Sequence, residues 1–229
     1  MSVSVLDREM FSEAEAARLL QVPQNTLNYW LEGGEYRGKR YQPVIGERPR
    51  GGRAPVTWAE FVEAGLLRQY RRVHGVALAE LRAFIEKMRQ ESGIPYPLAH
   101  KQPYVSGKDL LAEVQDQAGL SADLCLVAYV RGQYVLTPPA DSFYKRVTWD
   151  DDVAAAWRPH NDPLSPILIR PGIRGGRPAI KGISTEILWE QEQAGEAIGS
   201  IAQDFGLADE DVRWAIAYET SARTKAPAA

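Results

Sequence analysis

The stretch Phe11–Leu31, with the sequence FSEAEAARLLQVPQNTLNYWL, decides how the N-terminal part of the chain folds. Ser12 followed three residues later by Glu15 is a capping-box pattern, and apolar residues at helical spacing come after it. Pro23 interrupts this helix and suits a loop or the first turn of a second one. The second helical pattern ends at Gly33-Gly34. The stretch therefore predicts a helix, a turn and a helix.

The second of these helices has an apolar face and a polar face. Leu27, Trp30 and Leu31 lie at i, i+3 and i+4 on the apolar side. Amide side chains at the start of a recognition helix pair with adenine edges in the major groove of DNA. We predict base contacts for the amides of the polar face: Gln24, Asn25 and Asn28. A solvated polar helix face is the alternative.

A basic stretch rich in glycine and proline follows, from Tyr36 to Pro55. Within it, Tyr41, Val44 and Ile45 predict a short hairpin. Lys and Arg on such a wing neutralise DNA phosphates. We predict phosphate contacts for the six cations of the stretch: Arg37, Lys39, Arg40, Arg48, Arg50 and Arg53. A basic loop without a ligand is the alternative, and the adjoining polar helix face favours DNA binding over it.

Two more helical patterns complete the N-terminal part, over Glu60–His74 and Ala79–Gln90. Together with Phe11–Leu20 and Thr26–Trp30, these segments resemble the winged helix of MerR-type regulators. The resemblance implies a DNA-binding domain, to which we assign residues 1–93. The chain departs from that family in its long, glycine-rich wing. It also lacks the long dimerisation helix and the cysteine-bearing sensor loop that would follow.

Residues 94–160 have the composition of a small β-rich middle region. We predict one antiparallel sheet within Tyr104–Trp149, made of three strands: Leu124–Val130, Gln133–Thr137 and Phe143–Trp149. Thr148 and Asp150 then predict the capped start of a short helix that runs to Trp157. The middle region is therefore expected to separate two helical parts.

Residues 161–229 are predicted to form a helical C-terminal domain. The connector Arg158–Pro178 that leads into it is rich in proline and glycine, with Ile167–Ile169 as one strand. Three helical patterns follow, separated by tight glycine breaks, and predict a second helix-turn-helix unit. The tail Thr220–Ala229 is small and polar, and we expect it to be frayed.

The segment Pro171–Thr185, PGIRGGRPAIKGIST, carries a more specific resemblance, together with Ala194–Glu196, Ile201–Leu207 and Asp211–Ile216. These segments resemble a small antitoxin domain catalogued as a domain of unknown function. That domain occurs in VapB-like antitoxins of type II toxin–antitoxin systems. The resemblance implies that the chain sequesters a PIN-like, VapC-type ribonuclease toxin and binds its own operator DNA as a dimer.

Such nucleases hold Mg²⁺ with acidic residues, and a partner disables the site by placing a guanidinium among the carboxylates. The candidate toxin contacts are basic residues of the C-terminal domain: Arg174, Arg177, Lys181, Arg213 and Arg223. The alternative is that Gly175–Pro178 is only a turn that enters the helices and that the cations are solvated.

Composition and charge exclude several classes of protein. The 229 residues are 45% hydrophobic and 25% charged, which is typical of one or two globular domains. The net charge is −3, but residues 1–108 hold 16 basic and 12 acidic residues, a net of +4. Residues 109–229 hold 11 and 18, a net of −7, so the first half suits a polyanion better. One cysteine, Cys125, excludes a disulfide framework and a cysteine-rich metal site.

We expect no cofactor, no metal site and no catalytic activity. The three histidines are widely spaced, the run Asp150–Asp152 is typical of an acidic helix start, and Gly107-Lys108 lacks the glycine spacing and hydroxyl of a phosphate loop. The N-terminus lacks a signal-peptide pattern and no window of ~18 consecutive apolar residues exists, so a cytoplasmic protein without membrane contact is expected. We predict an α+β fold and an antitoxin that neutralises its toxin and represses its own operon. A stand-alone MerR-like regulator that senses a small ligand is the alternative, and an RNA-processing enzyme is a third reading.

Overall fold

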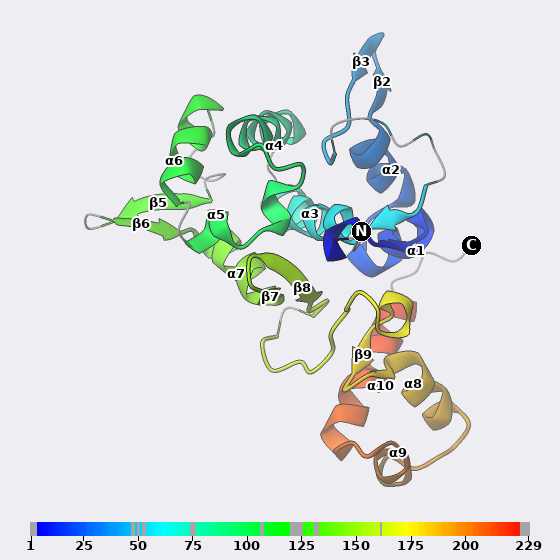
Figure 1. Ribbon diagram of the computed structural model, residues 1–229. Helices are drawn as coiled ribbons and strands as arrows, with labels where there is room; N and C mark the ends of the chain where they lie inside the picture. Colours follow the sequence, from blue (N-terminus) through cyan, green and yellow to red (C-terminus); the bar gives the residue numbers. More distant parts are fainter. Residues whose placement is uncertain are drawn as a thin grey trace. The chain divides into compact units, whose positions relative to one another are not determined.

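The computed structural model describes residues 4–46, 49, 51, 54–73, 77–105, 108–119, 126–130, 133–160 and 162–224. Helices alternate with two-stranded antiparallel sheets (Figure 1), which confirms the predicted α+β class. The chain divides into two compact units, Met1–Ala155 and Ala156–Ala229. None of the helices within the described ranges is both long and apolar enough to cross a membrane.

The first unit begins with the predicted pair of helices. The 3₁₀ helix Val5–Asp7 and strand β1, Glu9–Phe11, precede α1, Glu13–Leu20, and α2, Gln24–Glu32. The hydroxyl of Ser12 accepts the Glu15 amide at 3.2 Å, as the capping-box pattern predicts. Gln21 ends α1 in the left-handed conformation, and Gly33 ends α2.

A hairpin follows α2 directly, earlier in the chain than predicted. Strand β2, Gly34–Tyr36, pairs antiparallel with β3, Lys39–Tyr41. Arg37 and Gly38 between them both have positive φ, which is the backbone of a two-residue type I′ turn. The prediction that Val44 and Ile45 belong to the hairpin was wrong. Both are buried, and their amides donate to the Trp30 carbonyl at 2.8 and 3.0 Å instead.

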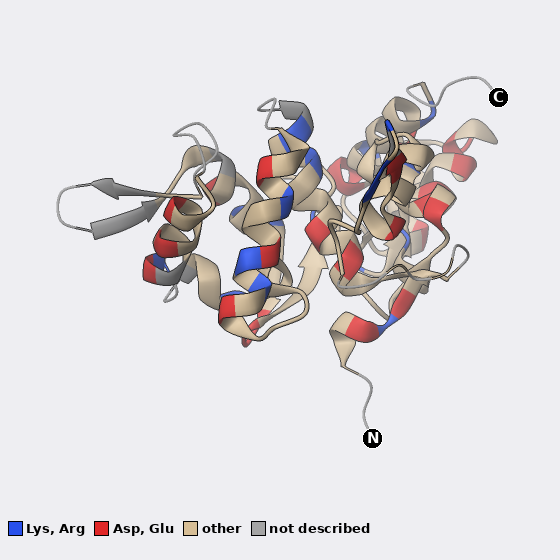
Figure 2. Ribbon diagram, turned by 90° about the horizontal axis from the view of Figure 1, so that it is seen from above, with Lys and Arg blue, Asp and Glu red and all other residues tan. Residues whose placement is uncertain are grey.

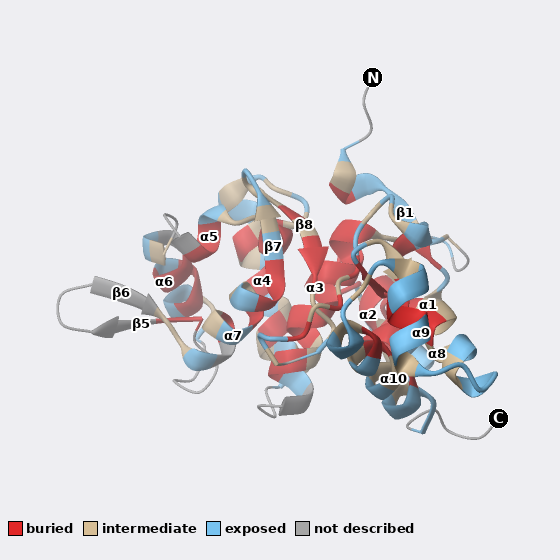
Figure 3. Ribbon diagram, turned by 90° about the horizontal axis from the view of Figure 1, so that it is seen from below, coloured by how far each residue is buried: buried red, intermediate tan, exposed pale blue. Residues whose placement is uncertain are grey.

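Helix α3 is the centre of the first unit. Strand β4, Val56–Thr57, pairs with β1, and Thr57 forms a full capping box with Glu60 at the start of α3, Trp58–Arg68. Every residue of α3 from Trp58 to Leu67 is buried (Figure 3). A π-helical turn, Gln69–Val73, extends it, and α4, Leu78–Ser92, follows as predicted.

The rest of the first unit corrects the prediction of one sheet within Tyr104–Trp149. The hairpin β5–β6 matches the first two predicted strands, with Val127 paired to Leu136, and the third is a strand only from Val147, in β7, which pairs with β8 in a separate sheet. Helices occupy much of the region, because apolar residues are spaced for burial on one helix face and Pro138 suits a first helical turn. The elements after α4 are the 3₁₀ helix Pro97–Ala99, α5 (Gln102–Val105), α6 (Lys108–Gln117), β5 (Val127–Val130), β6 (Gln133–Leu136), α7 (Pro138–Arg146), β7 (Val147–Asp150) and β8 (Val153–Trp157).

Two further predictions in this region were wrong. Phe143 lies in α7, so the predicted third strand is a helix that gives way to β7 only at Val147. The predicted helix to Trp157 is strand β8. Its backbone pairs with His100 through a bridge at Val153, and the Trp58 indole donates to the Ala154 carbonyl. These long-range contacts outweigh the helix propensity of its three alanines.

The second unit is a small helical domain entered through short paired segments. Leu168 bridges Ala179, and strands β9 and β10 form a hairpin that the sequence analysis did not predict. Three helices follow the hairpin, as predicted. The elements are β9 (Ala179–Ile180), β10 (Ile183–Ser184), α8 (Thr185–Gln193), α9 (Ile198–Phe205) and α10 (Asp209–Thr224). Their buried core contains Ile167, Ile180, Leu188, Ile201 and Val212. The predicted fraying from Thr220 was wrong as far as Thr224, and residues 225–229 lie outside the described chain.

Candidate functional sites

The polar face of α2 is only partly available to a ligand. Gln24 and Asn25 are exposed in the first turn, whereas Leu27 and Trp30 on the opposite face are buried. Asn28 is half-buried, and its Nδ2 donates to both carboxylate oxygens of Glu13 at 3.1 and 3.2 Å. The structure therefore brings Gln24 and Asn25 together as an exposed amide pair. Asn28 would have to leave Glu13 before its amide could donate to a base.

The hairpin β2–β3 presents three of the six predicted phosphate-binding cations. Arg37, Lys39 and Arg40 are all exposed. Arg37 lies in the turn, and Arg40 lies opposite Glu35 on the paired strand. In Figure 2 the two strands of the hairpin carry both basic and acidic positions. The other three candidates, Arg48, Arg50 and Arg53, lie outside the residues that the structure describes.

The base of the hairpin is packed tightly against the end of α2. Gly33 has φ +72°, and a Cβ atom at this position would lie 2.2 Å from the Tyr41 carbonyl oxygen. Only glycine allows the two backbones to approach so closely. On the same side, the amides of Val44 and Ile45 donate to the Trp30 carbonyl. The hairpin is thus attached to α2 through backbone contacts on one side.

Arg82 of α4 holds the other side of the hairpin base, and sequence reasoning missed it. Its guanidinium donates to the carbonyls of Gln42 and Pro43 and, at 3.3 Å, to the Tyr29 hydroxyl. The partners of Arg82 lie 39 to 53 positions away in the chain, so no local sequence pattern predicts the contact. A cavity of about 400 Å³ adjoins the site, with Arg82 and Arg40 in its lining.

The first unit also contains a buried carboxyl group, that of Glu63. Glu63 of α3 is fully buried, and its Oε1 accepts the Leu98 amide at 3.2 Å. Burial raises the pKa of Glu63 to about 7, and the nearby Arg89 guanidinium, 4.0 Å from Oε2, opposes that shift. Arg89 also donates to the carbonyls of Val44 and Pro95 at 3.1 and 2.8 Å. Burial also raises the pKa of Tyr96 to about 12.

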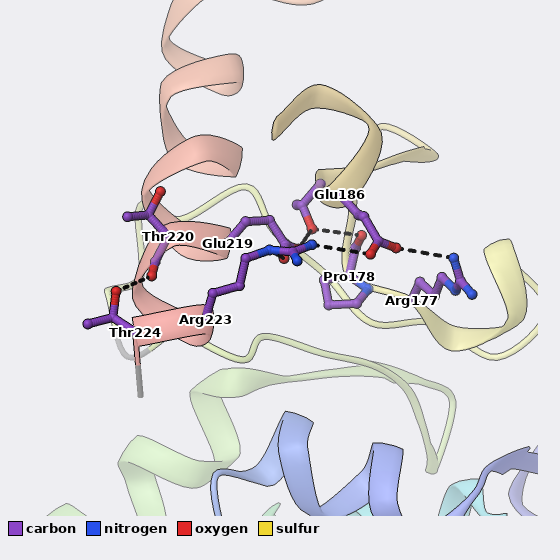
Figure 4. Close-up of polar contacts among 8 residues, drawn as sticks. Arg177, Pro178, Glu186, Glu219, Thr220, Arg223 and Thr224 are labelled. Carbon is purple, nitrogen blue, oxygen red and sulfur yellow. Dashed lines mark hydrogen bonds and ion pairs between the residues drawn. The ribbon is translucent and has the colours of Figure 1, made fainter. Parts of the chain in front are cut away.

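The predicted toxin contacts in the second unit are largely paired within the unit itself. Glu186 lies between Arg177 and Arg223, with both guanidiniums 3.2 Å from its carboxylate oxygens (Figure 4). The Arg223 guanidinium also lies 4.0 Å from the centre of the Trp189 ring. Lys181 forms an ion pair with Asp211 at 2.9 Å.

Two of the predicted cations differ from this pattern. The Nε of Arg174 donates to the Gly182 carbonyl at 3.1 Å, which leaves the rest of its guanidinium toward solvent. Arg213 is exposed and makes no hydrogen bond or ion pair with any described residue. The structure therefore does not gather the five predicted toxin contacts into one cluster; Arg177 and Arg223 meet at Glu186.

A buried polar contact anchors this ion-pair group. The hydroxyl of Thr185, at the start of α8, donates to Glu219 Oε1 of α10 at 2.6 Å, and both residues are buried. Arg223 Nε lies 3.7 Å from the second carboxylate oxygen of Glu219. The contact joins the first turn of α8 to the C-terminal half of α10.

Comparisons with known proteins match both units. The family model described as "Protein of unknown function (DUF433)" matches residues 167–218, within the predicted C-terminal domain. The Mycobacterium tuberculosis protein named "Uncharacterized protein Rv2308" is 32% identical over 236 residues, which cover 95% of this chain and 93% of that one.

A second relative and a solved structure match nearly the whole length as well. The M. tuberculosis protein named "Putative antitoxin VapB45" is 25% identical over 225 residues, 92% of this chain and 93% of the other. The crystal structure of Rv2018 from the same organism has a TM-score of 0.72 at 24% identity, and covers 92% of this chain and 99% of that one. At that identity the likeness shows the fold alone.

Proposed function

This chain belongs to the same family as the mycobacterial protein Rv2308, and we propose that it is the antitoxin of a toxin–antitoxin pair. Its similarity to VapB45 over 92% of the chain is the observation that carries the proposal. The matched family domain at residues 167–218 supports it, since the C-terminal segments resemble an antitoxin domain. The proposed role is binding, without catalysis.

The finer proposal is that the second unit neutralises a PIN-like ribonuclease toxin. The ion pairs of Arg177 and Arg223 with Glu186 are exposed, and exposed pairs contribute only about 0–1 kcal/mol each. Either guanidinium can therefore exchange Glu186 for a carboxylate of the toxin's metal site at small cost. Bidentate pairing with those carboxylates would compete with metal binding.

The first unit is proposed to bind operator DNA, with the chain acting as a dimeric autorepressor. Gln24 and Asn25 lie exposed at the start of α2, and the hairpin after it exposes Arg37, Lys39 and Arg40. Amides for base edges beside cations for phosphates are what a winged DNA-binding domain requires. A dimer would match two half-sites of a palindromic operator.

The decisive experiment recovers the tagged full-length chain gently from its native cell. We expect a small protein to copurify, to cleave RNA with Mg²⁺ when freed from the complex, and to stop cleaving when the chain is added back. The double variant Arg177→Ala/Arg223→Ala should suppress cleavage poorly, and Lys87→Ala in the first unit serves as the control. A copurified protein without ribonuclease activity would contradict the toxin assignment.

The DNA-binding part is tested separately on duplexes from the region upstream of the gene. Replacing Gln24 and Asn25 by Ala should lower the preference for operator over random duplex, because base contacts carry the discrimination. A loss of equal size on both duplexes would contradict base reading by these residues.

The cavity of about 400 Å³ beside the hairpin base favours a second candidate, a regulator that senses a small ligand. Cavities of this size accept small molecules, and its lining contains Arg40, Arg82 and Arg89. Recovery of the chain with specific DNA and without any protein partner would favour this candidate over the antitoxin.

A further inference from the structure

The strand pairing within the hairpin β2–β3 does not by itself fix the orientation of the hairpin relative to the helices of the first unit. It contains three residue pairs, and an isolated two-stranded hairpin of this size is marginally stable in water. It extends away from the helices of the first unit (Figure 1). Its orientation must therefore be set at its base, where the chain leaves α2 and returns along Gln42–Ile45.

We propose that Arg82 is the positioning residue that holds this hairpin in register with α2, so that both elements meet DNA as one surface. The inference rests on the proposed DNA binding. It assigns to Arg82 a role through the hairpin, without contact to DNA of its own.

The guanidinium of Arg82 contacts three parts of the unit at once. It donates to the carbonyls of Gln42 and Pro43, which follow β3, and to the hydroxyl of Tyr29 on α2. Its central carbon lies 5.8 Å from the ring centre of Tyr29 and 5.5 Å from that of Tyr41. One planar group on α4 is therefore placed against both the helix and the hairpin.

Only an arginine fits this arrangement. The three acceptors need several donors in a fixed plane, and the two rings favour a flat, weakly hydrated cation. A lysine offers a compact, strongly hydrated ammonium whose three donors radiate from one nitrogen, so it has neither the fixed fork nor the flat face that the rings contact. Replacement by lysine therefore keeps the charge and removes the positioning.

The contacts of Arg82 lie at the surface of the first unit and are not part of its buried core. Arg82 is half-exposed, and its neighbours Leu81 and Phe84 supply the buried face of α4. The carbonyls that it binds can accept water when it is absent. Loss of Arg82 should therefore change the direction of the hairpin more than the stability of the unit.

The test is a double-mutant cycle on operator binding by the full-length chain. Lys39→Ala/Arg40→Ala removes two hairpin cations, and should flatten the slope of log affinity against log salt by up to ~1.8. Arg82→Met and Arg82→Lys should each weaken binding by about 10-fold, since misdirected cations lose their phosphates. In the Lys39→Ala/Arg40→Ala background, Arg82→Met should cost less than about 2-fold.

The matched control is Lys87→Met, which removes a cation from the same helix. Lys87 pairs with Glu91 at 3.1 Å and makes none of the hairpin contacts. It should bind operator DNA as the parent chain does. Full affinity in Arg82→Lys would overturn the proposal, because charge alone would then suffice. An Arg82→Met cost that is equal in both backgrounds would overturn it too, since Arg82 would act independently of the hairpin.

A measurement without DNA separates this inference from the proposed function. The amides of Val44 and Ile45 report the attachment of the hairpin base to α2. Their hydrogen exchange should rise at least about 10-fold in Arg82→Met and stay unchanged in Lys87→Met, while α3 keeps its protection. If the parent chain binds no DNA, the proposed function fails and this result still decides the role of Arg82. Unchanged exchange in Arg82→Met overturns it.

Discussion

Two exposed cations on the hairpin of the first unit and three in the second unit are held in opposite ways. On the hairpin of the first unit, Lys39 and Arg40 form no ion pair with any residue in the described part of the chain. In the second unit, Arg177, Lys181 and Arg223 are each paired with a carboxylate. The first surface offers charge directly to a polyanion, whereas the second must exchange one carboxylate for another. The difference suits DNA for one unit and an acidic protein site for the other.

The largest expected effect comes from the close backbone approach that positions the hairpin. Gly33→Ala should lower the free energy of unfolding by about 3 kcal/mol, because the new Cβ meets the Tyr41 carbonyl and the backbone must shift. Gly38→Ala is the matched control. Gly38 also has positive φ, but nothing lies near its Cβ position, so the cost should be about 1 kcal/mol. Equal losses in urea unfolding would show that the hairpin base is not tightly packed.

The buried Glu63 should make the first unit sensitive to pH. Its pKa rises from the ordinary 4.5 to about 7 in the folded chain, so the folded state binds the proton more tightly. The contribution of Glu63 to stability is therefore full below pH 4.5 and falls by up to about 3 kcal/mol as the pH rises from 4.5 to about 7. Glu63→Gln should flatten this slope in urea unfolding between pH 5 and 8, and the exposed Glu91→Gln should leave it unchanged. A slope that survives Glu63→Gln would assign it to another group.

In the second unit, the buried hydroxyl of Thr185 should matter more than the surface ion pairs. Thr185→Val removes the donor to Glu219 and leaves a buried carboxylate with one partner fewer, at a cost of about 2 kcal/mol. Thr224→Val removes only an exposed hydrogen bond to the Thr220 carbonyl and should change stability by less than about 0.5 kcal/mol. Equal effects on the thermal midpoint would mean that the buried contact does not anchor α10.

The smallest effect on stability is expected at Glu186. This variant nevertheless tests most directly whether the paired cations of the second unit exchange their carboxylate partner. Glu186→Gln removes the charge shared by Arg177 and Arg223 and should cost under about 1 kcal/mol, as exposed pairs do. If those guanidiniums exchange Glu186 for a toxin carboxylate, the variant should bind toxin more tightly than the parent chain in titration calorimetry. Weaker binding would contradict the exchange and assign Glu186 itself to the interface.

Helices α1–α4 and α8–α10 could be predicted because their signals are local. Ser12 and Glu15 lie one helical turn apart, and the apolar stripes of α3 and α8–α10 repeat every three to four residues. The hairpin was predicted too late in the chain. Gly38 in the turn Arg37-Gly38 was the local signal for its true position. Pro43 argued against a strand that contains Val44 and Ile45. The segment Val153–Trp157 was predicted as helix because alanine favours one, and its long-range partners decided otherwise.

By itself, the sequence determined where helices α1–α4 and α8–α10 lie, which residues present amides and cations, and which domain resembles an antitoxin. These properties depend on residue types and on spacings of three or four positions. Only the tertiary structure decided that Asn28 is bound to Glu13, that Glu63 is buried, that Glu186 joins two arginines and that Arg82 holds the hairpin. Most of these partners lie far apart in the chain, and packing of whole elements brings them together. Residue types and local spacings do not predict which elements pack against one another.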